Sequence, residues 1–192
     1  MRKNGLFKHF HLVVYFLLAL LCSFPGHSQA EQFDVGSQFP PFTLPAPDSA
    51  DAQTYLGLKT SGPFSISQTS SKIVIVEFMS ALCPHCQTNA PVINKVYKTV
   101  QDDAGLAADV KLVAVAVGNN QKQVDAFKKT YNVAFPMFVD ETFTISGPLG
   151  GVDTPTTLVL AAGSGKVLAC HTGIIKDFDG FVKELREIRK KQ

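Results

Sequence analysis

Two apolar runs stand out from the pattern of hydrophobic and polar positions, at residues 73–78 and 112–117. Both are short and rich in β-branched residues, which is typical of strands covered on both faces. Three further strands are predicted at residues 135–139, 156–160 and 166–171. Gly163 and Gly165 lie between the last two, so this pair of strands is predicted to form a hairpin.

Three amphipathic helices are predicted around these strands. Residues 84–100, 121–131 and 177–190 repeat apolar side chains at spacings of three and four. Strands and helices alternate along the chain, which closes with a hairpin and a helix. This order predicts an α/β fold of three layers, with a central mixed sheet flanked by helices.

The segment before the first long strand differs in composition. Residues 31–71 are rich in proline, and we expect them to form an N-terminal arm of the same domain as the core at 72–192. Short edge strands are expected near residues 42–44 and 64–66, because proline inside a run is confined to edges and loops.

Residues 1–30 have the pattern of a secretory signal. Three basic residues precede an uncharged apolar run near residues 12–21, and Ser28-Gln29-Ala30 fits a small-x-small cleavage site. The run is shorter than the roughly 20 apolar residues that span a bilayer. We expect cleavage after Ala30, with an uncleaved membrane tether as the alternative. Cys22 follows Leu21, where a lipoprotein signal needs a small side chain, so lipid attachment is not expected.

Charge and cysteine content change the picture in two ways. Removing the signal leaves 15 basic and 16 acidic residues, a net charge of −1, and no basic stripe points to nucleic acid. Export places the protein in a periplasmic or other extracytoplasmic compartment, where disulfides persist. Three cysteines remain there, Cys83, Cys86 and Cys170. One close pair and one remaining thiol fit a redox couple better than a structural framework.

The sequence Cys83-Pro84-His85-Cys86 follows the first buried strand and opens a helix. Free backbone N–H groups and the helix dipole at that point favour a thiolate, so the pKa of Cys83 should be depressed. Cys86 is placed one turn on, where it can resolve a mixed disulfide. Pro84 is tolerated in the first turn, where its missing N–H has no partner to lose.

Two other interpretations of the pair stay open. Half a zinc site needs further ligands, and Cys170, His171 and His85 are the remaining mature candidates. Cys170 and His171 are neighbours in a predicted strand, so they point to opposite faces. A purely structural disulfide is the second interpretation, although so short a loop constrains the unfolded chain little. We expect Cys170 itself to be a buried small apolar residue.

Residues 72–190 resemble the thioredoxin superfamily in five features that occur in the same order. They are Glu77 six residues before Cys83, Cys83-x-x-Cys86, Ala90-Pro91 in the active-site helix, Thr154-Pro155-Thr156 before a strand, and Thr172-Gly173 after the hairpin. The inserted helix and strand at 121–139, with the N-terminal arm, resemble the exported redoxin or TlpA-like branch. Two departures are Leu82, where an aromatic residue is usual, and the dipeptide Pro-His, which is better known from DsbA-like oxidants.

The resemblance implies a thiol–disulfide oxidoreductase without a prosthetic cofactor or metal. It implies Cys83 as nucleophile, Cys86 as resolving thiol and Glu77 as a buried proton acceptor. Pro155 would be cis and would expose the Thr154 backbone for pairing with a substrate strand. The partners implied are thiols or disulfides of exported proteins, together with a membrane or soluble redox partner that recycles the pair. Pro84 and His85 would tune the redox properties of Cys83.

Two rival functions remain. A peroxiredoxin-like peroxidase resembles this branch in fold, but that family places a threonine three residues before its reactive cysteine and a proline four residues earlier. Ser80 and Val76 stand at those positions, so the peroxide site would be incomplete. A metal-binding chaperone built on the same fold is the second rival.

Overall fold

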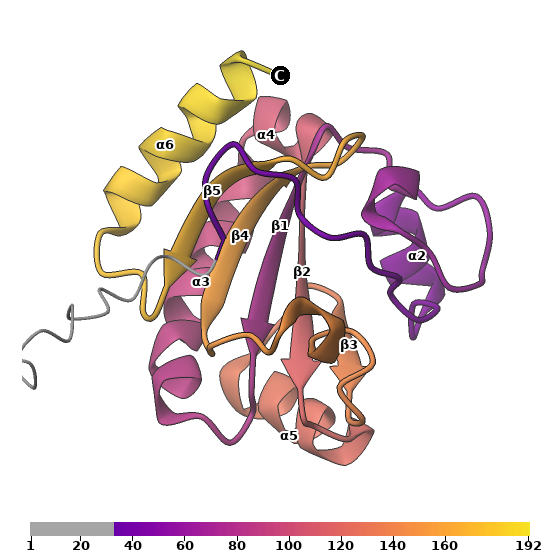
Figure 1. The fold of residues 1–192 in the computed structure, drawn as a ribbon. Coiled ribbons are helices and arrows are strands. Elements are labelled where there is room, and N and C mark those ends of the chain that lie inside the picture. The colour runs from indigo at the N-terminus through magenta and orange to yellow at the C-terminus, as the bar shows by residue number, and fades with distance from the viewer. Residues whose placement is uncertain (1–32) are drawn as a thin grey trace, which may run out of the picture. The chain divides into compact units, whose positions relative to one another are not determined.

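The computed structural model describes residues 33–192, so the expected signal at 1–30 lies outside the described residues. A five-stranded sheet forms the centre of the fold, in the order β3-β2-β1-β4-β5 (Figure 1). The strands are β1 (Ile73–Met79), β2 (Val110–Val117), β3 (Met137–Asp140), β4 (Thr156–Ala161) and β5 (Val167–Thr172). The first three are parallel, and β4 and β5 are antiparallel to their neighbours, so the sheet is mixed as predicted.

Helices and the N-terminal arm cover opposite faces of this sheet. The helices are α2 (Ala50–Leu56), α3 (Pro84–Asp102), α4 (Ala104–Asp109), α5 (Gln121–Tyr131) and α6 (Phe178–Lys190). In Figure 1, α3 lies behind the sheet and the indigo arm crosses in front of it. All seven residues of β1 are buried, because its alternate side chains enter two separate apolar layers. The predicted three-layer sandwich is confirmed.

Each apolar layer takes every second side chain of β1. Ile73 and Ile75 pack with residues of α3, α5 and α6, whereas Val74 and Val76 pack with residues of the arm such as Phe64. Glu77 therefore faces the helical layer, since it continues the alternation of Ile73 and Ile75. This placement puts the one carboxylate of the strand under the helix that carries the cysteines.

The arm differs from the expectation in two respects. The predicted edge segments at 42–44 and 64–66 do pair, but only through a single antiparallel bridge between Leu44 and Phe64, and a 3-10 turn follows at Ile66–Gln68. Proline residues on either side of Leu44 lack the N–H groups that a longer ladder needs. The helix α2 was not predicted, although Ser49 caps its start through the Ala52 N–H at 3.1 Å and Gly57 ends it with a φ of 66°.

Elsewhere the predicted elements are confirmed with small shifts at their ends. The strand β3 begins at Met137 rather than at residue 135, and the short helix α4 was missed. Asp103 caps α4 by accepting hydrogen bonds from Gly105 and Leu106. Cys170 is buried as expected. No helix among the described residues has the length and apolar character needed to cross a bilayer.

Candidate active site

The two cysteines occupy the start of α3. Cys83 is the N-cap residue, Pro84 is the first residue of the helix, and Cys86 lies in the first turn. The short segment after β1 is tied back by the Cys83 N–H, which donates to the Ser80 carbonyl oxygen at 3.1 Å. Both cysteines are free thiols in the structure; Cys83 is partly exposed and Cys86 is buried. The accessible thiol is therefore that of Cys83, at the N-terminus of α3.

The surroundings shift the pKa values of the two thiols in opposite directions. Partial desolvation opposes ionisation of Cys83, but hydrogen bonds from the Cys86 backbone and thiol, and from the Thr154 side chain and the His85 backbone, outweigh it and lower the pKa. Desolvation dominates at Cys86 and raises its pKa to about 12, although the Ser80 N–H points at its sulfur at 3.4 Å. One thiol is prepared for ionisation and the other is kept protonated.

Glu77 is buried beneath the first turns of α3, with 4% of its surface exposed. Desolvation raises the pKa of its carboxyl from 4.5 to about 7, against the opposing effect of a hydrogen bond from Asn89. The Asn89 Nδ2 donates to Glu77 Oε1 at 2.9 Å. Asn89 lies one helical turn beyond Cys86, so the carboxyl sits under the turn that carries the Cys86 thiol.

The Thr154–Pro155 peptide bond is cis and lies against the first cysteine. The Cys83 Sγ lies 3.4 Å from the Thr154 carbonyl oxygen. The Pro155 carbonyl oxygen accepts a hydrogen bond from the Gly173 N–H at 2.7 Å, which anchors this loop to the end of β5. The structure thus brings together Cys83, Cys86, Thr154 and Pro155 from segments about 70 residues apart.

Sequence reasoning missed two asparagines that hold the site. Asn89 contacts Glu77, and the buried Asn119 accepts a hydrogen bond from the Ala81 N–H through its Oδ1 at 2.7 Å. Gln87 fixes the same short segment by donating from its side chain to the Ala81 carbonyl oxygen at 3.0 Å. Their positions could have identified them as buried polar residues, because Asn119 follows a buried strand and Asn89 lies on the apolar stripe of a helix.

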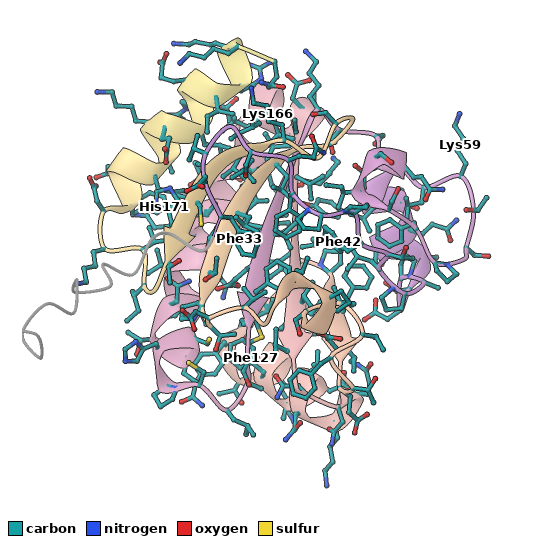
Figure 2. The ribbon with its side chains drawn as sticks, in the orientation of Figure 1. Phe33, Phe42, Lys59, Phe127, Lys166 and His171 are labelled. Carbon is teal, nitrogen blue, oxygen red and sulfur yellow. The ribbon has the colours of Figure 1, made fainter. Side chains whose placement is uncertain are left out.

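A shallow hollow of about 250 Å³ lies beside the segment that precedes Cys83. Its walls come from the segment before Cys83 and from α5, and they include Leu82, Gln87, Phe127 and Tyr131. The Leu82 side chain is 67% exposed, and Phe127 lies on α5 at the lower end of the molecule in Figure 2. The side chain of His85 is exposed on the adjoining surface.

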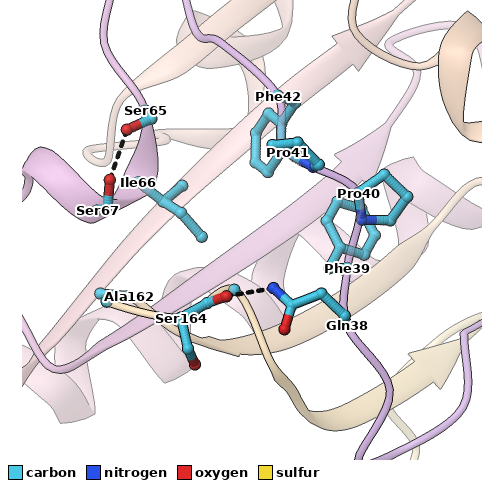
Figure 3. Close-up of a pocket in the computed structure, with 12 residues that line it drawn as sticks. Gln38, Phe39, Pro40, Pro41, Phe42, Ser65, Ile66, Ser67, Ala162 and Ser164 are labelled. Carbon is cyan, nitrogen blue, oxygen red and sulfur yellow. Dashed lines mark hydrogen bonds between the residues drawn. The ribbon is translucent and has the colours of Figure 1, made fainter.

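Other features lie away from this centre. A second hollow of about 180 Å³ is lined by the arm and by the hairpin around Ser164, at the opposite end of β1 from the cysteines (Figure 3). His171 lies on β5 beside α6, where it is paired with Glu184 at 2.7 Å (Figure 2). Within residues 33–192, no group of three or more His, Cys, Asp or Glu side chains is placed to hold a metal ion.

The mixed sheet, its covering helices and the dithiol at the start of α3, together with the match to a family model, define a redoxin of the thioredoxin superfamily. The chain belongs to the AhpC/TSA family, whose sequence profile matches residues 35–184. The resemblance seen in the sequence is thereby confirmed.

Three comparisons place the chain among named proteins. It is 29% identical over 143 residues to the thioredoxin-like protein YneN of Bacillus subtilis, covering 72% of this chain and 71% of YneN. It is 27% identical over 142 residues to the thiol-disulfide oxidoreductase ResA of Bacillus subtilis, covering 71% of this chain and 76% of ResA. The fold matches that of a candidate thiol:disulfide interchange protein DsbE from Chlorobium tepidum, with a TM-score of 0.62 at 20% identity, over 82% of this chain and 99% of the other.

Proposed function

We propose that this chain is a thiol–disulfide oxidoreductase that exchanges disulfides with exported proteins through Cys83 and Cys86. The observation that carries the proposal is the placement of the pair at the start of α3, with Cys83 partly exposed and Cys86 buried. This placement lowers the pKa of Cys83 and raises the pKa of Cys86. A disulfide exchanger needs an ionised thiol to attack and a protonated thiol held in reserve. The similarity to ResA, named as a thiol-disulfide oxidoreductase, supports the same activity.

The first step joins the protein to its substrate. In the reductive direction the Cys83 thiolate attacks one sulfur of a substrate disulfide, the substrate S–S bond breaks, and one substrate thiolate leaves and takes a proton from water. A mixed disulfide then links Cys83 to the substrate. The Thr154 carbonyl oxygen lies 3.4 Å from Cys83 Sγ, which supports a role for the Thr154 backbone in aligning the substrate chain beside this bond.

The second step releases the substrate. Cys86 loses its proton to the Glu77 carboxylate, and its sulfur attacks Cys83 Sγ. The mixed disulfide breaks, the second substrate thiolate leaves, and Cys83 and Cys86 are joined by a disulfide. Two electrons have passed from the protein to the substrate, and the oxidative direction is the same sequence reversed. Glu77 suits this role because its pKa of about 7 makes it a base at neutral pH.

Location and partners complete the proposal. Residues 1–30 act as a secretory signal, so the mature chain from residue 31 works in an extracytoplasmic compartment, either released or tethered. Its substrates are thiols or disulfides of exported proteins. A membrane or soluble redox partner resets the Cys83–Cys86 couple after each cycle. The hollow beside Leu82, which has both apolar and polar walls, would offer a contact surface for the chain that flanks the substrate cysteine.

A trapping experiment tests the function. The purified protein and its variants Cys83→Ser, Cys86→Ser and Cys170→Ser are mixed with a disulfide-bonded peptide, and adducts are mapped by mass spectrometry. Cys86→Ser should accumulate a mixed disulfide at Cys83, and Cys83→Ser should form none. Cys170→Ser is the matched control and should behave like the unaltered protein. Equal trapping in all three variants would refute the assignment.

The same samples separate the rival functions. Hydrogen peroxide consumption in the presence of a thiol reductant should stay at the level of the Cys83→Ser variant. Rapid peroxide turnover that depends on Cys83 would instead identify a peroxidase. Stoichiometric binding of zinc or copper that consumes both thiols would support a metal-binding chaperone.

A further inference from the structure

Asn89 uses both ends of its amide inside the protein. It is fully buried on α3, where its Nδ2 donates to Glu77 Oε1 at 2.9 Å and its Oδ1 accepts from the Ile175 N–H at 3.1 Å. A backbone N–H can only donate, so Ile175 fixes the amide oxygen on its own side. The amide nitrogen must then face Glu77, as a donor to the carboxylate.

The bond to Ile175 leads back to the substrate-docking loop. Ile175 lies in the short connection after β5, two residues beyond Gly173. The Gly173 N–H donates to the Pro155 carbonyl oxygen at 2.7 Å, and the Thr154 carbonyl oxygen lies 3.4 Å from Cys83 Sγ. A connected set of contacts therefore runs from the buried carboxyl, through the amide and this connection, to the cis-proline loop.

Asn89 is the side chain that donates a hydrogen bond to the Glu77 carboxyl. The sheet register places Ala114 and Thr157 on either side of the carboxylate, on the same face. His171 follows Thr157 in the same row, and it is paired with Glu184 of α6.

The helix α3 adds the Cys86 thiol and the Asn89 amide to this surrounding. The acidic and basic groups that these elements bring to the same face as Glu77 include Cys86, on the same helix as Asn89, and the His171–Glu184 pair beyond Thr157.

We propose that Asn89 is a positioning residue that aims the Glu77 carboxyl for proton transfer from Cys86 and links its ionisation to substrate docking at Thr154–Pro155. This inference rests on the proposed function. A donated hydrogen bond stabilises the carboxylate over the neutral acid, so losing it makes Glu77 a base only at higher pH. A substrate strand that settles on the docking loop also orders Ile175 and the amide bound to it, and linkage requires an equal effect in return.

The first test measures resolution of the mixed disulfide as a function of pH. In Asn89→Leu, which keeps the branched shape of the side chain but removes both bonds, the midpoint should move up by about one pH unit, so the rate at pH 7 should be roughly fivefold slower. Asn89→Asp keeps an acceptor for Ile175 but places a second acid against Glu77, so its midpoint should rise further. Asn94→Ala is the matched control, since Asn94 is on the same helix and bonds instead to the Tyr131 carbonyl oxygen.

The second test measures the link to docking. The pKa of Glu77 is followed by carbon NMR of its carboxyl in the Cys86→Ser variant, free and as a mixed disulfide with a cysteine peptide. The value should differ by about half a unit or more between the two states, and adding Asn89→Leu should remove most of this difference.

The outcomes are separable. Absence of disulfide exchange by the unaltered protein would overturn the proposed function itself. Normal exchange with the same pH midpoint in Asn89→Leu and Asn94→Ala would overturn the positioning role. A docking-dependent shift in Glu77 that persists in Asn89→Leu would overturn the link. Circular dichroism of each variant confirms that it is folded before the kinetics are compared.

Discussion

Replacing Glu77 with glutamine should stabilise the protein at neutral and alkaline pH. The carboxyl has a pKa of about 7 in the folded chain, against 4.5 for an ordinary glutamate. Between these values the folded protein holds a proton that the unfolded chain releases, so stability must fall as the pH rises from about 4.5 to about 7 and then level off. Glutamine is nearly isosteric, carries no charge and still offers an oxygen to the Asn89 amide.

The size of the effect follows from the same two values. Their difference of 2.5 units, at 1.36 kcal/mol per unit, corresponds to about 3 kcal/mol of free energy of unfolding. Relative to Glu77→Gln, the unaltered protein should lose about 3 kcal/mol between about pH 4.5 and about pH 8. Thiol ionisation and the exposed carboxylates affect both proteins equally and cancel in this comparison.

Urea unfolding under reducing conditions, at intervals across this pH range, measures the difference directly. Glu141→Gln is the matched control, because Glu141 is an exposed glutamate directly after β3. Its difference from the unaltered protein should stay within about 0.5 kcal/mol. The same Glu77→Gln variant should resolve mixed disulfides slowly. A pH-independent difference in stability would refute the buried, neutralised carboxyl, and unchanged exchange from about pH 6 to about pH 9 would remove Glu77 from the chemistry.

Three further predictions concern the thiols and the arm. Iodoacetamide at about pH 6 should alkylate Cys83 before Cys86 or Cys170, and peptide mapping that finds another order would reverse the assigned roles. The couple should have a reduction potential above the value of about −270 mV of thioredoxin, and His85→Ala should lower it by roughly 30 mV, a tenfold change in the equilibrium with glutathione. A reduction potential equal to that of thioredoxin, unchanged by His85→Ala, would indicate a reductase. Ser49→Ala removes the cap of α2 and should cost about 1 kcal/mol in urea unfolding, whereas no loss would mean that the cap is not needed.

The core of the fold was predictable because its strands and helices have clear patterns of apolar residues in the sequence. The strands β1 and β2 are recognisable in the sequence as apolar runs rich in β-branched residues. The helix α5 has the predicted bounds, and Asn120 caps its start and Asn132 its end. The arm was not predictable in the same way. Its fold depends on contacts such as Leu44 with Phe64, which follow from burial against the sheet rather than from any local repeat.

The site residues also fall into those that the sequence reveals and those that it does not. Cys83 and Cys86 are visible from their spacing and from the strand before them. Asn89 and Asn119 could not be identified from the sequence, because they act through hydrogen bonds to Ile175 and Ala81. These partners are distant in sequence and become neighbours only in the folded chain. A polar residue on the apolar stripe of a helix indicates a buried hydrogen bond, but the sequence does not show which residue is its partner.

The arm also closes the open side of the sheet. The Gly36 N–H donates to the Val167 carbonyl oxygen at 2.8 Å, and the Val167 N–H donates to Ser37 at 2.9 Å, at the start of the edge strand β5. The arm is synthesised early, but the strand that it pairs with is among the last parts of the chain to be made. Until the hairpin at 161–167 has emerged, Phe39 and Phe64 lack part of the layer they pack into. A chain that is synthesised from its N-terminus completes this layer only near the end of its synthesis, and an unpaired strand edge stays exposed to neighbouring chains until then.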